Sequence, residues 1–316
     1  MTSPSTISPT TTTSAPVDSL DTLLPAATAM DAVTLHVADL ARMSAYYRDA
    51  LGLVELDDGI RRTDVGAAGR GVVVLGRGAV PLVVLAHTPD LPAPRAGQAG
   101  LFHTAMLFAD LPALARAVAS AAAHPLSVYV GSADHLVSQA FYFTDPEGNG
   151  IELYWDRPRS QWQWDGGRVR MASLPLDPRA FLSTHLDRDH LIAPSTADEA
   201  EVGHVHLKVG DIPTARDFYV GTMGFEITAD LGTALFVSAG GYHHHMGMNT
   251  WESAGAGPRA ATIGLGQVSI TVPGRADLEQ LGARLSARAV RFQDDGRTLR
   301  LLDPWNSLLE ISSLDA

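Results

Sequence analysis

One strand-and-helix pattern occurs four times along the chain, and this repetition restricts the possible folds more than any single motif does. In the first copy an alternating strand is followed by Asp39, a good helix N-cap, and by a predicted helix that ends at Gly52. Further strand-like segments complete the copy. The opening strands of the four copies begin at Ala32, His103, His204 and Gln267. We therefore predict an α+β fold of four βαβββ modules.

The end of the second copy, Phe141–Trp155, has the pattern of a strand, a tight turn and a second strand. The second strand carries Glu152 between two apolar residues, so its carboxylate points to the opposite face of the sheet. Taken alone, such a carboxylate is slightly more often solvated than a ligand in a cavity. The fourth copy repeats the spacing, because Glu310 follows Asp303 at the same distance as Glu152 follows Asp145.

The four opening strands indicate where ligands could converge. Their apolar residues should pack on the helix, and the alternate residues should line a concave face. The first concave position is His103 or His204 in the second and third copies, but Ala32 or Gln267 in the other two. With Glu152 the two histidines form a 2-His-1-carboxylate set, which holds Fe(II) or a similar ion. We expect modules 2 and 3 to form one cup around the metal, and modules 1 and 4 to form a metal-free cup.

A plainer interpretation stays open, in which His103 and His204 are hydrogen-bonded strand residues and Glu152 is solvated. A lone strand histidine is structural more often than not, but two at equivalent positions of a repeat favour the metal site. The chain contains no cysteine, which excludes disulfides and thiolate metal sites. Any metal must therefore be bound by His, Asp or Glu.

Three consecutive histidines follow Tyr242 in a segment that we predict to be the last strand of module 3. Alternation would place His244 on the same face as Tyr242, Met246 and Met248. Because imidazole titrates near neutrality, His244 is a candidate acid–base residue. The two methionines could form the floor of an aromatic pocket, although packing in the core explains them equally well.

Two further side chains are candidates for a role in the same cup. Tyr142 lies on the strand that precedes the strand of Glu152, and it could be a catalytic or a packing residue. His135 is a loop histidine and could simply be exposed.

Composition restricts the class of protein. The net charge of −12 argues against nucleic acid or an anionic membrane as partner. No apolar run is long enough to span a bilayer, so the cytoplasm is the default location. Residues 1–29 contain no Lys or Arg and are predicted to be a disordered tail. We expect residues 156–202, with Trp162 and Trp164 pinned to a domain, to link segments 30–155 and 203–316.

These features resemble the vicinal oxygen chelate superfamily, and within it the type I extradiol catechol 2,3-dioxygenases. The resemblance covers about residues 30 to 312. It rests on four motifs: Asp-His-Leu-Val-Ser (134–138), Asp-Pro-Glu-Gly-Asn-Gly-Ile-Glu-Leu-Tyr-Trp-Asp-Arg-Pro (145–158), Gly-His-Val-His-Leu (203–207) and Ser-Ala-Gly-Gly-Tyr-His-His-His (238–245). Together they are specific for a catechol-dioxygenase-like branch of the superfamily.

The resemblance implies paired modules that form two half-open barrels. It also implies Fe(II), with Mn(II) as an alternative, at residues that match His103, Glu152 and His204. An acid–base histidine matches His244, and a tyrosine that donates hydrogen bonds near the metal matches Tyr142. His135 lies in the first motif and joins the candidate catalytic residues. The expected partners are a catechol-like aromatic molecule and O2, and a homo-oligomer stays open.

The chain departs from the better-known extradiol enzymes in one respect. Those enzymes take all their ligands from the last two modules, whereas Gln267 occupies the position of a histidine in module 4 here. Two rivals stay open. One is a glyoxalase-like isomerase or lyase that uses Ni, Zn or Mn, and the other is a metal-free binding protein of the bleomycin-resistance type. Bound metal separates the second rival from the enzymes, and oxygen consumption separates the two kinds of enzyme.

Overall fold

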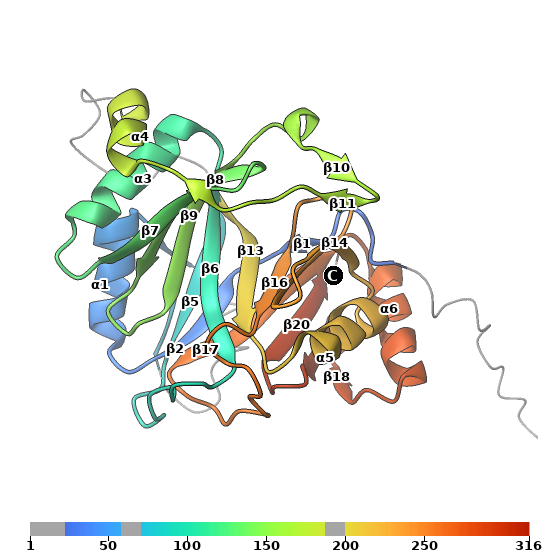
Figure 1. Ribbon diagram of the computed structural model, residues 1–316. Coiled ribbons are helices and arrows are strands. Elements are labelled where there is room, and N and C mark those ends of the chain that lie inside the picture. The colour runs from blue at the N-terminus through green and yellow to red at the C-terminus, as the bar shows by residue number, and fades with distance from the viewer. Residues whose placement is uncertain (1–22, 58–70, 187–199, 316) are drawn as a thin grey trace, which may run out of the picture.

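The computed structural model describes residues 23–57, 71–186 and 200–315, and in these ranges its strands form two large sheets with helices against them (Figure 1). Each module has an opening strand, a helix and three more strands, which confirms the predicted α+β fold of four βαβββ modules. Neither sheet closes into a barrel.

The elements of modules 1 and 4 are β2 (Val33–Val37), α1 (Leu40–Leu51), β3 (Val54–Leu56), β4 (Val72–Arg77) and β5 (Val80–His87), then β17 (Gly264–Val272), α6 (Arg275–Ala287), β18 (Phe292–Asp294), β19 (Thr298–Leu302) and β20 (Leu308–Ser313). Those of modules 2 and 3 are β6 (Gly100–Phe108), α3 (Leu111–Ala123), β7 (Val128–Asp134), β8 (Ser138–Thr144) and β9 (Gly150–Asp156), then β13 (Ala200–Lys208), α5 (Ile212–Arg216), the π-helical turn η4 (Asp217–Thr222), β14 (Glu226–Asp230), β15 (Ala234–Ser238) and β16 (Met246–Asn249). The shorter elements are β1 (Ala29–Met30), η2 (Arg159–Gln161), β10 (Trp164–Asp165), β11 (Arg168–Val169), β12 (Leu174–Pro175) and α4 (Pro178–His185).

The same pairing rule holds in all four modules. The opening strand pairs in parallel with the last strand of its own module: β2 with β5, β6 with β9, β13 with β16 and β17 with β20. Opening strands then join modules by antiparallel pairing, β6 with β13 and β2 with β17. Modules 2 and 3 therefore share one sheet and modules 1 and 4 the other, as the sequence predicts.

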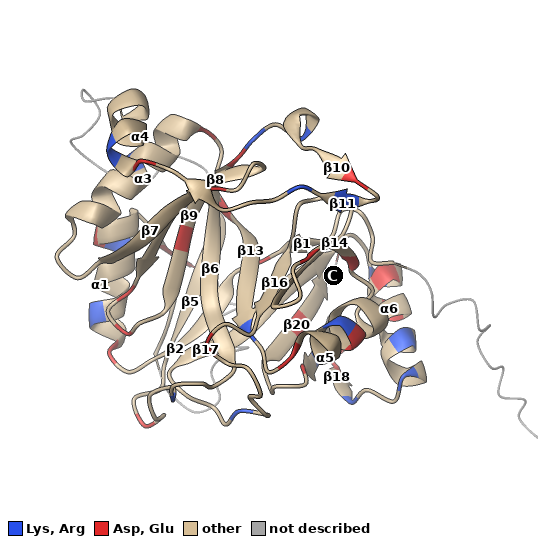
Figure 2. Cartoon of the chain, viewed as in Figure 1, with Lys and Arg blue, Asp and Glu red and all other residues tan. Residues whose placement is uncertain are grey.

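Local sequence accounts for these elements. The Asp39 side chain accepts a hydrogen bond from the backbone N–H of Arg42 and so caps α1, which ends at Gly52 as predicted. The apolar residues of the opening strands, such as Val33 and Val205, lie in the core that the helices cover. Charged residues are frequent on the helices and loops, and the strands also carry some of them, such as Glu152 on β9 and Glu310 on β20 (Figure 2).

The turn between β8 and β9 joins the two sheets. The buried Asp145 carboxylate accepts hydrogen bonds from the backbone N–H groups of Glu147 and Asn149, and from the Tyr47 hydroxyl of α1 at 3.0 Å. The Glu147 carboxylate in turn accepts from the backbone N–H of Ala38, next to the start of α1. A module 2 turn is thereby docked on a module 1 helix.

Modules 3 and 4 repeat this contact. The Tyr219 hydroxyl donates to the Asp303 carboxylate at 3.0 Å, and that carboxylate also accepts from the backbone N–H groups of Trp305 and Ser307. The repeated aspartates are therefore structural turn residues that connect the sheets, whereas the glutamates that follow them are free to differ in role.

Three predictions concern the ends and the middle of the chain. Residues 1–22 of the predicted tail and 187–199 of the predicted linker lie outside the described residues, and the domain limits stay predictions. Within the described part, Leu24 is buried and β1 pairs with β17.

Trp162 is buried against Val137 and Tyr242, as expected of an anchor, but Trp164 is exposed. None of the described helices has the length and apolar character needed to cross a membrane.

Replacing Asp145 with Asn should remove a pH dependence of stability. Burial raises the pKa of the Asp145 carboxyl from 3.8 to about 6, although its hydrogen bonds partly oppose the shift. The folded protein therefore binds this proton more tightly than the unfolded chain. The resulting stabilisation is present at low pH and is lost as the pH rises through 6.

A rise of the Asp145 pKa from 3.8 to about 6 corresponds to a contribution of about 3 kcal/mol to the free energy of unfolding at low pH. Urea denaturation at about pH 4 and about pH 7 gives the free energy of unfolding of the wild type and of Asp145→Asn. The decrease in this free energy from pH 4 to pH 7 should be smaller in the variant. Asp303→Asn is the matched variant, because burial also raises the pKa of Asp303. An equal change of the unfolding free energy with pH in Asp145→Asn and the wild type would contradict this account.

Candidate metal centre

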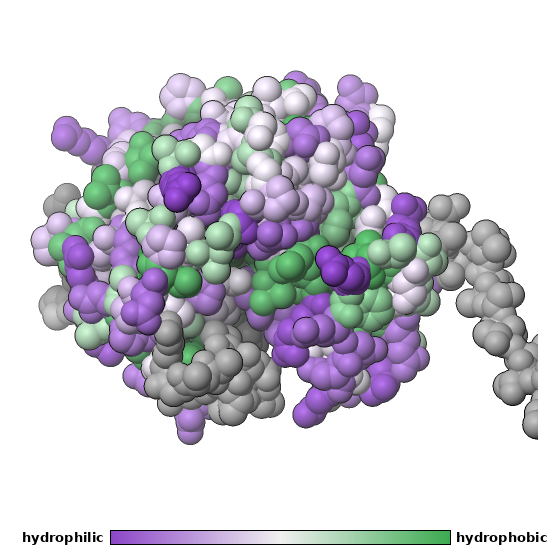
Figure 3. Space-filling view, turned by 90° about the horizontal axis from the view of Figure 1, so that it is seen from below, coloured by the Kyte–Doolittle hydropathy of each residue, from purple (hydrophilic) through white to green (hydrophobic). Residues whose placement is uncertain are grey.

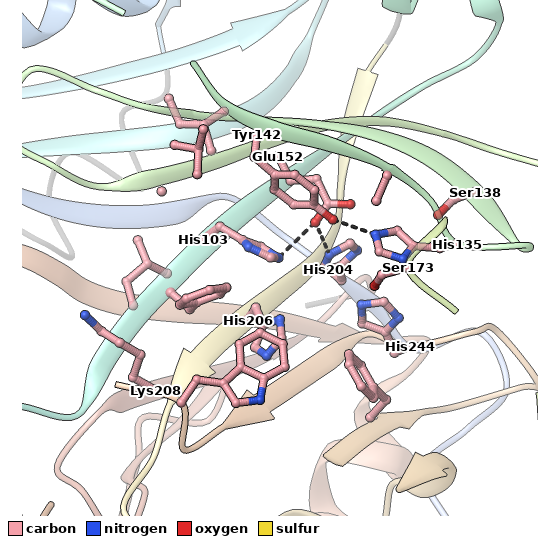
Figure 4. A pocket seen from close by; sticks show the side chains of 18 of the residues that line it. His103, His135, Ser138, Tyr142, Glu152, Ser173, His204, His206, Lys208 and His244 are labelled. Carbon is pink, nitrogen blue, oxygen red and sulfur yellow. Dashed lines mark hydrogen bonds and ion pairs between the residues drawn. The ribbon is translucent and has the colours of Figure 1, made fainter. Parts of the chain in front are cut away.

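Three buried side chains converge on the concave face of the sheet of modules 2 and 3 (Figure 4). Glu152 of β9 lies beside Ala105 of β6, and Ala105 pairs with His204 of β13. One carboxylate oxygen, Oε2 of Glu152, is 2.9 Å from Nε2 of His103 and 3.1 Å from Nε2 of His204. The three potential ligand atoms lie within 4.8 Å of one another. The structure thus brings together the three residues that the sequence predicts as metal ligands.

The donor set suits a divalent metal. Nε2 of His103 makes no hydrogen bond despite its short distance to Glu152, as expected when both atoms point at a common third position. Burial lowers the pKa of His204 to about 4, although Glu152 partly opposes this shift. Burial opposes ionisation of Glu152, but its two imidazole neighbours hold its pKa well below the usual value. A carboxylate beside the neutral imidazole of His204 is a protonation state that binds a metal.

The three residues line a cavity of about 550 Å³. Its walls are largely apolar and aromatic, and they include Phe102, Phe236 and Trp251. The cavity extends along the strands, so one end lies near His135 and Ser138 and the other near Lys208 (Figure 4). Figure 3 shows that hydrophobic residues also gather in a patch right of the centre of the lower face of the molecule, between hydrophilic ones. The size is typical of a site for a small organic molecule.

At the first end, three side chains form a hydrogen-bonded chain. The Asp156 carboxylate accepts from Nε2–H of His243 at 2.8 Å, and in the singly protonated ring Nδ1 of His243 is then left as an acceptor. Nδ1 of His244 lies 2.7 Å from that atom and must donate to it. The remaining nitrogen, Nε2 of His244, is then an unprotonated acceptor. The His244 ring lines the cavity, and its centroid lies 4.1 Å from that of the His204 ring, with the two planes tilted by 47°. Burial holds the pKa of His244 well below its usual value, so the ring is neutral.

The structure corrects one prediction about these histidines. They lie in a loop between β15 and β16 and not on a strand, because Gly240 and Gly241 both adopt positive φ after β15. Strict alternation therefore does not hold. His244 lines the cavity, whereas Met246 and Met248 belong to the hydrophobic core and do not form a pocket floor.

Tyr142 and His135 form a second hydrogen-bonded pair beside the metal-ligand candidates. Tyr142 pairs directly with Glu152 across β8 and β9. Its hydroxyl lies 2.7 Å from Nε2 of His135, whose Nδ1–H donates to the Ala172 carbonyl at 2.7 Å. Nε2 of His135 is therefore the acceptor, and the Tyr142 hydroxyl donates to it. Burial, and then the nearby Glu152 charge, raise the pKa of Tyr142 well above its usual value, so the phenol keeps its proton.

His206 is a cup-facing histidine to which the sequence reasoning gave no role. Asn249 accepts from the Trp251 backbone N–H through Oδ1, so its amide nitrogen donates to Nε2 of His206 at 3.0 Å. The proton of the His206 ring is therefore on Nδ1. Gly247 makes room for the ring, since a Cβ there would lie 2.9 Å from it. The sequence does contain a signal for this residue, because alternation along the strand places His206 on the same face as His204.

The cup of modules 1 and 4 has different side chains at the equivalent positions. Gln267 donates to the Ser269 hydroxyl at 3.0 Å, and Glu310 accepts from Arg300 at 2.7 Å. Within residues 23–57, 71–186 and 200–315, His103, Glu152 and His204 are the one group that could hold a metal.

Paired βαβββ modules around a buried 2-His-1-carboxylate group define the vicinal oxygen chelate class of protein. Comparison with known sequences agrees with this class. The chain matches the glyoxalase/bleomycin resistance protein/dioxygenase superfamily over residues 29–153 and 201–310, and it belongs to that superfamily.

Individual relatives are consistent with this assignment. The chain is 33% identical over 274 residues to catechol-2,3-dioxygenase of Bacillus subtilis (strain 168), covering 85% of this chain and 92% of the relative. Its fold is similar to that of a proposed dioxygenase from Bacillus subtilis subsp. subtilis str. 168, with a TM-score of 0.62 at 12% identity over 93% of this chain and 86% of the other. Glyoxalase I from Zea mays gives a TM-score of 0.54 at 14% identity over 91% and 92% of the two chains. The two structures support the fold alone.

Glu152→Gln should lower the affinity for a divalent metal at least about tenfold, because it removes the anionic ligand and keeps the shape of the side chain. Competition with a chromophoric chelator measures the affinity. Added metal should raise the melting temperature of the wild type more than that of the variant. His206→Gln is the control, because it changes a histidine of the same cup outside the ligand group and should retain the metal. Equal affinities of Glu152→Gln and the wild type would exclude this site.

Proposed function

We propose that the protein is a metal-dependent extradiol dioxygenase, which opens a catechol-type aromatic ring beside its two hydroxyl groups and adds both atoms of O2. The observation that carries the proposal is the position of His244. The His244 ring lines the cavity next to His204, so the site has one candidate proton acceptor beside a ligand group that has a single carboxylate. The identity to a protein named catechol-2,3-dioxygenase supports the same activity.

His103, Glu152 and His204 would hold the metal, for which Fe(II) is our first choice and Mn(II) the alternative. When bound, it would supply Lewis acidity and bring the diol and O2 together. The apolar cavity walls would exclude water, which strengthens every electrostatic interaction inside.

His244 would act as the general base. Nε2 would take a proton from a diol hydroxyl, and the same atom would return it later. His243 and Asp156 hold the tautomer that leaves Nε2 free, and the Asp156 carboxylate stabilises the cation that forms. This division of roles follows the logic of a buried carboxylate that orients a catalytic imidazole.

Tyr142 would stabilise negative charge on an oxygen of the substrate. Its hydroxyl lies beside Glu152 on the cup face and has one proton to donate, which in the structure goes to Nε2 of His135. A substrate oxygen that enters the cup would take over that hydrogen bond. His135, anchored by the Ala172 carbonyl, holds the hydroxyl in position before the substrate enters.

Oxygen uptake tests the proposed function directly. Anaerobically Fe(II)-loaded protein given catechol should consume O2 and form a yellow product, and His204→Ala should abolish both. The control is His36→Ala, which removes a histidine from the other sheet. No uptake across a panel of catechols, despite stoichiometric metal, would exclude the dioxygenase and favour an isomerase or lyase of the same superfamily.

Asp156→Asn should lower kcat at least about tenfold without loss of metal, because an amide no longer selects the His243 tautomer that leaves Nε2 of His244 free. Steady-state oxygen uptake and metal content measure the two effects. A fall in kcat with an unchanged KM is the expected signature. Unchanged kcat would show that His243 and Asp156 do not orient the base.

A further inference from the structure

The chain contains one lysine and 22 arginines, and the single lysine, Lys208, lines the cavity. It follows His204 and His206 at alternate positions of β13, so the three side chains face the cup in a row. Successive members of the row are about 6.6 Å apart along the strand. No arginine lines the described part of the cavity, and Lys208 is therefore its fixed positive charge.

The strand register places Lys208 at the end of the cavity remote from the acid–base groups. Lys208 pairs with Gly100 at the start of β6, whereas Ser138 pairs with Asp156 at the end of β9. Because β6 and β9 are parallel, these two positions lie at opposite ends of the sheet, as Figure 4 shows for Lys208 and Ser138. A diol whose hydroxyl groups contact His244 would extend toward Lys208.

The ammonium group of Lys208 is available to a ligand. Its nearest carboxylate is that of Glu252, at 3.8 Å from Nζ, and the Glu252 side chain is 66% exposed against 27% for Lys208. Glu252 also lines the cavity, but because its side chain is mostly exposed, its ion pair with Lys208 contributes little and an anion can displace it at small cost. The walls at this end include Leu101, Phe102 and Trp251. An ion pair formed between apolar walls is stronger than one in water.

We propose that this end of the cavity is a subsite for an anionic substituent, so that the preferred substrate is an aromatic diol that bears a carboxylate. The inference rests on the proposed function for the diol, but the subsite itself depends on Lys208 alone. Because the chain has a net charge of −12, a local cation is needed to favour an anionic ligand at this position.

A matched pair of ligands tests the proposal. Anaerobic calorimetry on the full-length, Zn(II)-loaded protein would compare 3,4-dihydroxyphenylacetate with neutral 4-ethylcatechol. We expect the carboxylate to bind about tenfold or more tightly, as a charge-assisted hydrogen bond allows. Lys208→Met, which keeps the apolar stem, should lose this preference. Lys208→Arg, which keeps the charge, should retain most of it. Equal affinities in the wild type, or a preference that survives in Lys208→Met, would refute the subsite.

Glu252→Gln provides a second variant that does not touch the lysine. It removes the competing carboxylate, so it should tighten binding of 3,4-dihydroxyphenylacetate about twofold and leave 4-ethylcatechol unchanged. Equal effects on both compounds would count against the subsite.

The single lysine permits a readout that is independent of turnover. An amine-directed reagent modifies Lys208, and peptide mass spectrometry follows the rate. 3,4-Dihydroxyphenylacetate should slow the reaction several-fold, and 4-ethylcatechol much less. If neither diol supports oxygen uptake but the carboxylate still protects Lys208, the subsite stands and the dioxygenase proposal fails. If 4-ethylcatechol is consumed and both compounds protect equally, the dioxygenase stands and the subsite fails.

Discussion

The antiparallel pairing of β6 with β13 is the contact on which the candidate metal centre depends. It joins two modules that are far apart in sequence, and its register brings His103 and His204 to neighbouring positions of one concave face. Parallel pairing of β9 with β6 then adds Glu152 beside them. A shift of one residue in either register would turn these side chains toward the helices, where no polar group could be accommodated. The helix-facing apolar residues therefore determine the position of the ligands as well as that of the core.

Burial creates the next requirement, because it lowers the pKa of His204, His206 and His244, and a neutral imidazole needs a defined tautomer. Hydrogen-bonded chains from outside the cup meet this requirement. Asp156 acts through His243 on His244, and the Ala172 carbonyl acts on His135. Each hydrogen-bonded chain begins at a group that can only accept a hydrogen bond. This group determines the direction of every later hydrogen bond in its chain. The cup thus presents hydrogen-bond acceptors and donors in a fixed pattern.

The sequence predicts the parts of this arrangement that follow a period. Alternation along β13 and β9 is enough to place His204 and Glu152 on the concave face, and the repeat shows which modules lack ligands. Contacts that follow no sequence period could not be predicted in this way. The histidine loop after β15 depends on two glycines with positive φ, and the contact of Asp156 with His243 joins residues of different modules. No local pattern reports such contacts, since they arise only when the modules pair.

The same pairing also explains why the two ends of the cavity differ in chemistry. β13 is antiparallel to β6 but parallel to β16, so the loop that carries His244 lies beside the start of β13 and Lys208 lies at its end. The proposed proton acceptor, His244, and the cation, Lys208, are therefore separated along one strand, with His206 between them. A ligand that engages both ends must be oriented along β13. Under the proposed function, this orientation would make selection among diols depend on the substituent far from the reacting oxygens.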